Sequence, residues 1–495
     1  MKICLINPSQ KQERLGSFGK FAPAIPPTGL AYIAAVLIQD GFEVVIIDQH
    51  ARRWDNVRLL KEVCIIRPDV VGFSCLTFVM DSVEDASKKI RSQLPNIKIV
   101  LGNIHPTIFH REIIESGLAD FVVRGEGENT MRDLCIALRD NRDLRAVDGI
   151  TFRDNGKLRV NPDRSAIKDL DSLPYPQWEL LVGPKYDAFG VKIFENCKFP
   201  VPMLASRGCA FHCEFCSQNI VYKGLRKRNL FKVADEIEYL CDRVGHRAFG
   251  FIDANFPPDI NYGHNFADEV VKRGLQHKIV WFCETRVDMV DKDLLRHLYQ
   301  AGLRLVQFGV ESGDAEVLKL MNKSFLRETA INAFRWARET GLITVGLFMI
   351  GMPAETRRQI EDTLRFARKL KPDLVKFSIA TPYPGSFLWE RYKEFLIEQP
   401  TWKYSGWLDI NAHDGSYLLE EHRIPSRELL YLQRKGMFLF YSQPRILKRL
   451  FLDDLLPLSL IYLGFLTFLQ IVFSNLVNFI KRILKNEKGI SVSAG

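Results

Sequence analysis

The sequence predicts an α/β protein with an N-terminal doubly wound parallel sheet, a central partial (β/α)6 barrel of the TIM-like kind and a C-terminal helical region. Short apolar, β-branched runs alternate with helical hydrophobic periods from residue 1 to about 140, and again from about 200 to 380. This alternation is typical of repeated strand–helix units around parallel sheets. After about residue 400 only helical periods continue. The expected divisions are 1–140, 141–192, 193–400 and 401–495.

Residues 1–140 contain five runs with the composition of buried strands. They are Lys2–Ile6, Glu43–Asp48, Val70–Ser74, Ile97–Leu101 and Phe121–Val123. A doubly wound sheet binds ligands at the carboxyl ends of its strands, so the candidate ligand contacts are the residues that follow these runs: Asn7, Pro8, Ser74, Gly102, His105, Pro106, Arg124, Gly125, Glu126 and Gly127. No G-x-G-x-x-G follows the first strand, which argues against a dinucleotide. A scaffold domain with an empty crevice is the alternative.

The segment 141–192 reads as a hairpin followed by a linker. Alternating residues flank Asp154-Asn155-Gly156 within Gly149–Val160, and Asn-Gly between such runs is typical of a type I′ hairpin. Residues 170–176 then include two prolines, which interrupt regular structure.

The second series of strands predicts the partial barrel. Its six candidates are 200–205, Phe249–Asp253, Val280–Glu284, Leu303–Val310, Thr344–Ile350 and Val375–Ala380. In such barrels the functional residues follow the carboxyl ends of the strands. Polar or glycine-rich segments stand at four of these ends, beginning at Asp253, Glu284, Gly309 and Gly351.

Three cysteines directly after the first barrel strand are the strongest chemical signal. Cys209, Cys213 and Cys216 have C-x3-C-x2-C spacing, so one loop can hold a [4Fe-4S] cluster and leave its fourth iron open. A zinc site would need a fourth ligand, and His212 lies inside the loop, where it would strain the coordination. The other seven cysteines stand in apolar stretches and read as reduced core residues.

This cysteine run, with Phe215 before its third cysteine, resembles the cluster motif of the radical S-adenosylmethionine (SAM) enzymes. A second resemblance covers the N-terminal region: Asn-Pro after the first strand, then Pro26–Leu30, Gly102–Thr107 and Arg124–Glu128 are similar to the cobalamin-binding domain fused to many of these enzymes. Asn103 replaces the usual second glycine and is expected to narrow the groove for the cofactor. The resemblance covers residues 1 to about 400.

The resemblance implies a [4Fe-4S] cluster, SAM and cobalamin as cofactors. It places SAM against the strand-end residues Phe215, Asp253, Glu284, Arg286, Glu311, Ser312, Gly351 and Pro353. A guanidinium fork matches a carboxylate bidentately, which suits Arg286 to the SAM carboxylate. Asp48-Gln49-His50 lacks the spacing of a cobalt-ligating motif, so we expect no histidine on cobalt.

The implied function is reductive cleavage of SAM, hydrogen abstraction from an unactivated carbon and C-methylation of a hydrophobic or lipid-like small molecule. Oxidative cyclisation or carbon–carbon coupling by the same machinery is one alternative. A non-catalytic protein that binds cobalamin or lipid is another, although it would be expected to have lost a cluster cysteine. An electron donor such as flavodoxin or ferredoxin is implied as a partner.

Charge and hydropathy bear on location and on the remaining partners. The net charge of +9 is spread along the chain, which argues against nucleic acid. No secretory signal opens the sequence, so we expect reducing cytoplasm. Residues 455–480 carry no charge, have a polar stripe and are flanked by basic residues. They predict an interfacial anchor on the inner face of the cytoplasmic membrane, with a true span or a buried helix as alternatives. We expect the chain from Arg445 onward to serve as this anchor rather than to fold the barrel.

Overall fold

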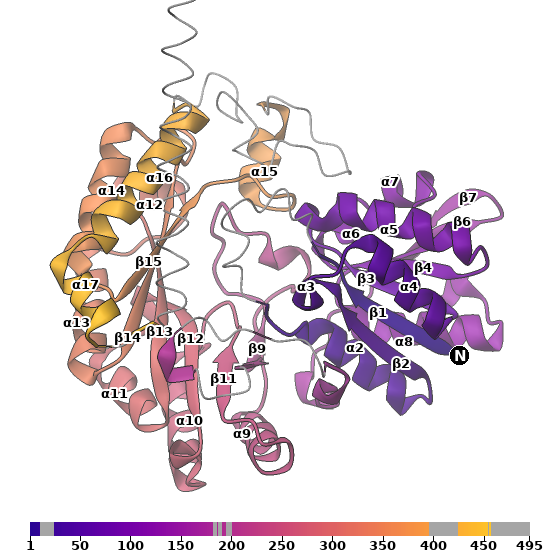
Figure 1. The fold of residues 1–495 in the computed structure, drawn as a ribbon, viewed down its shortest axis with the longest axis horizontal. Helices are drawn as coiled ribbons and strands as arrows, with labels where there is room; N and C mark the ends of the chain where they lie inside the picture. The colour runs from indigo at the N-terminus through magenta and orange to yellow at the C-terminus, as the bar shows by residue number, and fades with distance from the viewer. Residues whose placement is uncertain are drawn as a thin grey trace, which may run out of the picture.

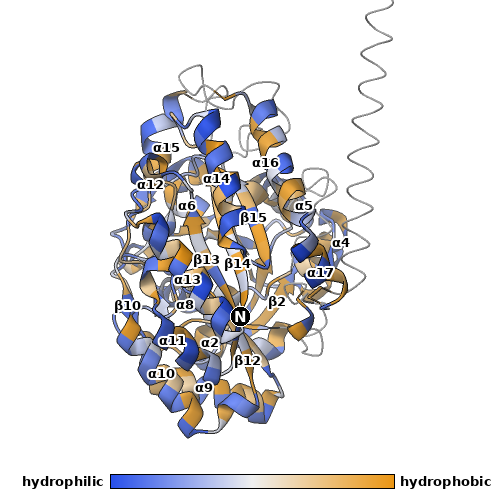
Figure 2. Ribbon diagram, turned by 90° about the vertical axis from the view of Figure 1, so that its left-hand side faces the viewer, coloured by the Kyte–Doolittle hydropathy of each residue, from blue (hydrophilic) through white to orange (hydrophobic). Residues whose placement is uncertain are grey.

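The computed structural model describes residues 1–9, 24–181, 186, 191–194, 200–395, 424–453 and 455–456. Figure 1 shows two α/β bodies, the N-terminal sheet with its helices and the barrel, with the C-terminal helices on the outer side of the barrel. In Figure 2 the strands are mostly hydrophobic, whereas the surrounding helices contain both hydrophilic and hydrophobic residues. The predicted fold class is confirmed.

The N-terminal domain contains a seven-stranded sheet of order β2-β1-β3-β4-β5-β6-β7. Its strands are β1 Lys2–Asn7, β2 Glu43–Asp48, β3 Val70–Ser74, β4 Lys98–Gly102, β5 Phe121–Val123, β6 Ile150–Asp154 and β7 Lys157–Val160. The first five are parallel, as predicted. The chain reverses its direction of winding between β1 and β3, so the crevice expected of a doubly wound sheet lies at their carboxyl ends.

The hairpin β6–β7 has the predicted turn but a different place. Asn155 and Gly156 have φ of 48° and 80°, the two positive values of a type I′ turn. The hairpin does not stand between the domains, because β6 pairs antiparallel with β5 and extends the N-terminal sheet. This pairing satisfies the backbone groups that β5 would otherwise expose at a sheet edge.

Helices cover both faces of this sheet. They are α2 Thr28–Gln39, α3 Gln49–Arg52, α4 Asn56–Ile66, α5 Met80–Gln93, α6 Ile104–Ile108, α7 His110–Glu115 and α8 Gly127–Asp140. Helices α2 and α8 pack together on one face, and α4 packs against α5 on the other. The α4–α5 face has its own core, in which Leu59, Val63 and Val83 are fully buried.

The barrel is an open sheet of six parallel strands in the order β15-β14-β13-β12-β11-β8. The strands are β8 Val201–Met203, β11 Ala248–Phe251, β12 Val280–Arg286, β13 Leu303–Glu311, β14 Ile343–Ile350 and β15 Leu374–Ile379. All six were predicted. The helices around them are α9 Leu230–Tyr239, α10 Ile260–Lys272, α11 Lys292–Gln300, α12 Ala315–Leu320, α13 Arg327–Thr340, α14 Arg357–Leu370 and α15 Phe387–Tyr392.

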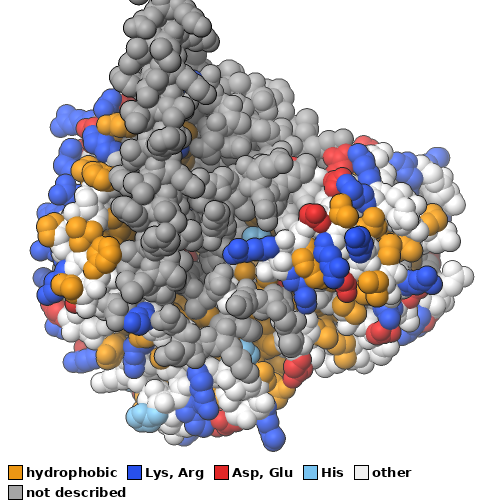
Figure 3. Space-filling model, viewed as in Figure 1, with side chains coloured by type: hydrophobic (Ala, Val, Ile, Leu, Met, Phe, Trp, Pro, Cys, Tyr) orange, Lys and Arg blue, Asp and Glu red, His pale blue; other side chains and the backbone are white. Residues whose placement is uncertain are grey.

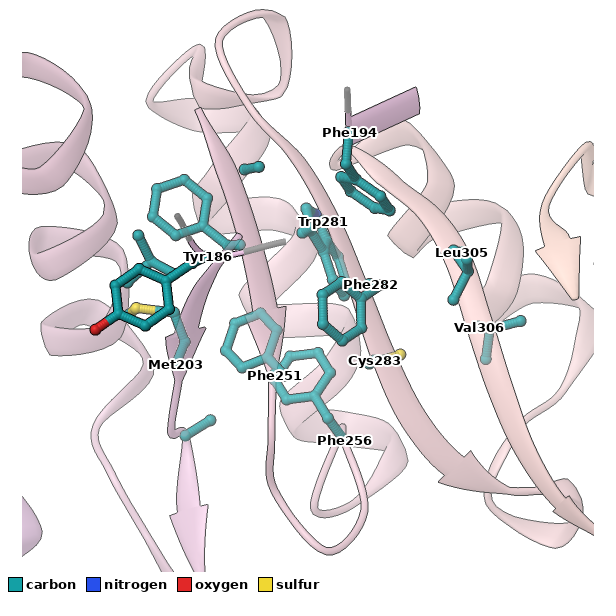
Figure 4. Close-up of a cluster of buried hydrophobic side chains, with 14 of the residues drawn as sticks. Tyr186, Phe194, Met203, Phe251, Phe256, Trp281, Phe282, Cys283, Leu305 and Val306 are labelled. Atoms are coloured by element: carbon teal, nitrogen blue, oxygen red, sulfur yellow. The ribbon is translucent and has the colours of Figure 1, made fainter. Parts of the chain in front are cut away.

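Alternation along β12 separates the helix-facing side of the barrel from its lumen. Trp281 packs outward on the aromatic rings of α10 and its neighbours, whereas Phe282 points inward, toward Phe194 at a ring distance of 5.8 Å (Figure 4). A Cβ at Gly250 would lie 2.0 Å from the Phe282 ring, so only glycine leaves room for this ring. Aromatic side chains therefore close the floor of the lumen.

The C-terminal helices α16 Ser426–Tyr441 and α17 Pro444–Phe451 belong to the folded barrel. Ile446 is fully buried, and Arg449 pairs with Asp373 at 2.9 Å. The expectation that the anchor begins at Arg445 is therefore wrong, because α17 contributes to the core. Of the expected anchor 455–480, only 455 and 456 lie among the described residues. No helix in the part of the chain that the structure describes is long and apolar enough to cross a bilayer.

Candidate active site at the cluster loop

The three cysteines lie in one loop closed at its base by a short antiparallel ladder. The ladder pairs β9 Ser206–Arg207 with β10 Arg226–Lys227. Gly208 has φ of +82°, and a Cβ there would lie 1.9 Å from the carbonyl oxygen of Gly224. The glycine that opens the motif is therefore required by the close approach of the two ends of the loop.

Polar groups from the barrel surround the cysteine sulfurs. Asn255 Nδ2 lies 3.4 Å from Cys209 Sγ, and Arg286 Nη1 lies 3.9 Å from Cys213 Sγ. Burial raises the pKa of the Cys213 and Cys216 thiols, and the positive charge of Lys323 lowers it at both. The donor set fits an anionic iron–sulfur cluster. Among the described residues, no three acidic, cysteine or histidine side chains converge closely enough to bind a single metal ion. A cluster does not require such convergence, because each thiolate binds a different iron.

Arg286 stands at the carboxyl end of β12 beside this loop. Its guanidinium makes a bidentate pair with Asp288, at 2.8 and 2.7 Å, and lies 3.9 Å from the centre of the Phe211 ring. Arg286 is thus held rigidly against the cluster loop. Because Asp288 takes Nε and Nη2, only Nη1 is left for the expected contact with the SAM carboxylate. The Asp288 partner was not recognised in the sequence.

Glu311 and Lys323 form a second charged pair in this region. Lys323 Nζ donates to Glu311 Oε1 at 2.8 Å and to the carbonyl of Gly309 at 3.0 Å. Glu311 has φ of +65° at a register shift in β13, which aims its carboxylate back toward Lys323. Sequence reasoning missed Lys323, because nothing in its local pattern indicates that a lysine 12 residues later folds back onto this strand end.

Three strands of the barrel carry polar residues near Arg286: Glu284 on β12, Gln307 on β13 and Lys376 on β15. Glu284 is exposed, yet the pKa of its carboxyl is raised. Desolvation is the larger cause, and the negative charge of Glu311 is the second. Gln307 is the register partner of Glu284 on β13, and Lys376 on β15 is close enough to lower that pKa. Gln307 and Lys376 were not predicted, although a lone lysine in an apolar strand such as β15 was an available signal.

The segment after β14 forms an apolar wall near the loop. Phe215 and Met352 pack in one small cluster with buried residues of α12 and α15. Glu355 shapes the wall, because its carboxylate accepts hydrogen bonds from the amides of Gly351 and Met352, at 2.6 and 3.0 Å. Burial raises the pKa of Glu355 to about 7. Pro353 is also buried in this turn.

Asp253 and Ser312 were expected to contact SAM, but protein partners occupy their polar atoms. Asp253 accepts from Ser206 Oγ at 2.5 Å and from the Ala205 amide at 3.1 Å, and burial raises its pKa to about 6. Ser312 is fully buried against Thr363, at 3.0 Å. Both residues hold neighbouring backbone in place.

The crevice of the N-terminal domain opens at the carboxyl ends of β1, β3, β4 and β5. Asn103 has φ of +88°, and its side chain connects its own loop to the end of β3: Oδ1 accepts from the Ile104 amide at 2.7 Å and Nδ2 donates to Ser74 Oγ at 2.9 Å. Asn7 is similarly held by Asp48, at 2.9 Å. Gly102 and Gly125 lie at this edge, and a Cβ at Gly125 would meet no atom within 4 Å. These backbone turns leave an open cradle that fits a bulky cofactor.

Four other residues predicted for the crevice are engaged within the protein. His105 is fully buried with Nδ1 3.2 Å from Thr77 Oγ1, and Pro106 is buried beside it. Arg124 binds Asp163 and the carbonyls of Ile150 and Asn161, which ties the hairpin to the sheet. Pro8 is buried after β1.

Glu126 connects the crevice to the barrel. Its carboxylate receives the guanidinium of Arg226 and the backbone amide of Ile167, and Glu128 pairs with Arg207 at 2.6 Å. Gly127 begins α8, where a Cβ would lie 3.2 Å from Ile33 Cδ1. The turn predicted for cofactor binding thus also joins the two domains.

Comparison with known proteins agrees with this geometry. The family model of the B12 binding domain matches residues 17–135, and that of the radical SAM superfamily matches residues 203–367. An uncharacterized methyltransferase of Pyrococcus horikoshii is 32% identical over 453 residues, which are 90% of this chain and 94% of that protein.

The chain belongs to the radical SAM superfamily, in the group with an N-terminal B12-binding domain. This radical SAM protein is also 31% identical over 400 residues to the anaerobic magnesium-protoporphyrin IX monomethyl ester cyclase of Rubrivivax gelatinosus, over 79% of this chain and 70% of that one. The cobalamin- and cluster-bound methyltransferase TsrM from Kitasatospora setae shares its fold, with a TM-score of 0.65 at 20% identity, over 79% of this chain and 74% of TsrM.

The family membership confirms three predictions. The chain is an enzyme of this superfamily, its fold is that of a B12-binding domain joined to a radical SAM barrel, and its cofactors are a [4Fe-4S] cluster, SAM and cobalamin.

Proposed function

We propose that this radical SAM enzyme C-methylates a hydrophobic or lipid-like small molecule at an unactivated carbon. The observation that carries the proposal is that both cofactor regions meet at one loop. A Cβ at Gly385, in the loop after β15, would lie 2.5 Å from Ile220 of the cluster loop and 3.0 Å from Ile108 of α6 in the B12-binding domain. A substrate beside this loop would have access to both regions.

Apolar surface next to this loop supports a hydrophobic substrate. Tyr383 lies in the loop and Phe387 follows it, and both side chains are exposed. Exposed aromatic residues beside a site are typical of binding grooves for apolar ligands.

The residues described above have distinct roles in the proposed reaction. Cys209, Cys213 and Cys216 would hold the cluster, and the crevice turns at Gly102 and Gly125 would hold cobalamin. When bound, the cluster supplies the electron that cleaves SAM to a carbon-centred radical and cobalamin carries the methyl group, while the protein supplies orientation and exclusion of water.

The remaining site residues would orient SAM. Arg286, whose Nε and Nη2 are bound to Asp288, would present Nη1 toward the SAM carboxylate, and Glu284 would present an acceptor toward its ammonium group. The Gly351–Pro353 turn and Phe215 would enclose the adenine.

Oxidative cyclisation is the second candidate, because the similarity to the Rubrivivax gelatinosus cyclase is nearly as high as that to the Pyrococcus horikoshii methyltransferase. A non-catalytic binding protein is disfavoured, since all three cluster cysteines are present in a closed loop.

We place the enzyme in the reducing cytoplasm, at the inner face of the membrane, with flavodoxin or ferredoxin as electron donor. Leu447, Phe451 and Leu452 are exposed on or just after α17, beside the basic residues of that helix. Figure 3 shows hydrophobic side chains gathered on the side of the barrel where α17 lies. Exposed apolar side chains with basic neighbours fit an anionic lipid surface.

The test uses anaerobically reconstituted full-length protein with iron, sulfide, hydroxocobalamin, a reductant and SAM labelled with deuterium in its methyl group. It is incubated with a lipid extract, and products are analysed by mass spectrometry. A lipid that gains the labelled methyl group supports the proposal. A dehydrogenated product without label would show the cyclase, and 5′-deoxyadenosine without any lipid product would refute the substrate class.

A further inference from the structure

Two arginines face each other at the base of the cluster loop. Arg207 and Arg226 are register partners in the antiparallel ladder of β9 and β10, and their side chains are only 4% and 14% exposed. Like charges directly opposite each other destabilise an antiparallel pair, and buried charges without partners carry a large desolvation cost. The ladder that closes the cluster loop therefore needs counter-ions.

Both counter-ions come from the B12-binding domain. Arg207 Nη2 lies 2.6 Å from Glu128 Oε1 and its Nη1 lies 3.8 Å from Glu126 Oε2. Arg226 forms a bidentate pair with Glu126, with one of its bonds at 3.1 Å. The two glutamate side chains are 5% and 6% exposed. We call these four residues, Arg207, Arg226, Glu126 and Glu128, the domain clamp.

The residues of the domain clamp stand close in sequence to both cofactor regions. Glu126 lies between the two glycines of the crevice turn, and Arg207 is two residues before Cys209. We propose that the domain clamp positions the cobalamin crevice relative to the cluster loop, so that its residues are positioning residues of the reaction. This inference rests on the proposed function only for the presence of both cofactors.

The chemistry of the clamp suits positioning better than stabilisation. A buried ion pair seldom exceeds an apolar contact in net stability, but arginine–carboxylate pairs are directional and fix both distance and orientation. Tyr32 and Tyr222 flank Arg207, with ring centres 5.3 and 5.7 Å from its Cζ, and limit the movement of its guanidinium. Small misplacements between reacting groups cost large factors in rate, so a rigid connection here has a functional reason.

The test is Glu128→Gln, which keeps the size of the side chain and removes its charge. The matched control is Glu236→Gln: Glu236 is 1% exposed and its Oε2 lies 2.6 Å from Arg228 Nη1, but both residues lie within the barrel. Each full-length protein is reconstituted with iron, sulfide and hydroxocobalamin, and reduced until cobalt(II) and the reduced cluster are both paramagnetic. Pulsed electron paramagnetic resonance then measures the distribution of distances between the two centres.

The inference predicts one narrow distribution in wild type and in Glu236→Gln, and loss of the narrow component in Glu128→Gln. Arg207→Lys, which keeps the positive charge but not the guanidinium fork, is the second variant if Glu128→Gln does not fold. It should show the same loss of the narrow component. Production of 5′-deoxyadenosine from SAM reports that the barrel and cluster remain intact. A narrow distribution in both clamp variants overturns the inference, as does equal broadening in the control. A wild-type protein that holds its cluster but binds no cobalamin refutes the proposed function itself.

Discussion

Lys323 Nζ lies 2.8 Å from Glu311 Oε1, and this buried pair stands beside the cluster loop, where the charge of Lys323 acts on both Cys213 and Cys216. The turn that carries Lys323 also supports the loop, because Asn322 donates to the carbonyl of His212 at 2.8 Å. A fixed positive charge near a cluster stabilises its reduced form, which carries one more negative charge.

Replacement of Lys323 should therefore make the cluster harder to reduce. In Lys323→Met the midpoint potential of the cluster should fall by on the order of tens of millivolts, because one nearby unit charge is lost. A redox titration monitored by electron paramagnetic resonance measures this. Lys376→Met is the control, since that lysine acts on Glu284 and is not among the main charges that act on the two cysteines. An unchanged potential in Lys323→Met would show that the charge does not act on the cluster.

Glu355 should make stability depend on pH near neutrality. Its folded pKa of about 7 is above the ordinary value of 4.5 because of burial, so the folded protein binds this proton more tightly than the unfolded chain. Stability from this group is present at low pH and declines as pH rises from about 4.5 to 7. Glu355→Gln removes the decline and should raise the free energy of unfolding at pH 8 by up to about 3 kcal/mol. Urea unfolding at pH 6 and pH 8 checks this. An equal change in the free energy of unfolding between the two pH values in variant and wild type would contradict it.

No histidine should bind cobalt. In the B12-binding domain His105 is buried on Thr77, and His110 Nδ1 lies 3.0 Å from Thr151 Oγ1, with a pKa lowered to about 4 chiefly by burial. Paramagnetic resonance of the bound cobalt(II) form should show no hyperfine splitting from a protein imidazole. His50→Ala should bind cobalamin as wild type does. Imidazole splitting that disappears in His50→Ala would reverse this conclusion.

Truncation should separate membrane association from folding. A chain that ends after Leu456 keeps α17 and the hydrogen bond from the Lys192 amide to the Leu455 carbonyl, at 3.1 Å. It should retain its cluster and SAM cleavage but bind membranes more weakly than the full chain, because only the exposed apolar residues of α17 remain. A chain that ends before Pro444 loses buried Ile446 and Leu450 and should fold poorly. Membrane binding by the longer truncated chain that equals that of the full chain would show that residues 457–495 are not the anchor.

The strands were predictable because each is a short apolar run between clear helical periods. The cluster loop was predictable because its function fixes the spacing of Cys209, Cys213 and Cys216. Contacts between distant segments were not: Lys323, Asn255 and the partners of Arg207 reach the loop only after the chain has folded.

The roles of individual strand-end residues were also hard to assign from position alone. A polar residue at a strand end can face the binding site, as Glu284 does in the barrel. It can also bind neighbouring backbone, as Asp253 and Arg124 do. Local sequence does not distinguish these cases, because the direction of the side chain depends on the twist and register of neighbouring strands. The hairpin was misplaced for the same reason, since its pairing with β5 is not a local property.

The most direct test of the cluster site compares two cysteine variants of the anaerobically reconstituted full-length enzyme. Cys213→Ala removes a proposed cluster ligand, whereas Cys283→Ala changes a thiol that is 1% exposed in the barrel core. The measurement is the amount of 5′-deoxyadenosine formed from SAM with a chemical reductant. We expect none from Cys213→Ala and nearly the wild-type amount from Cys283→Ala. Formation of 5′-deoxyadenosine by Cys213→Ala at the wild-type rate would contradict the assignment of the cluster, and with it the radical SAM chemistry.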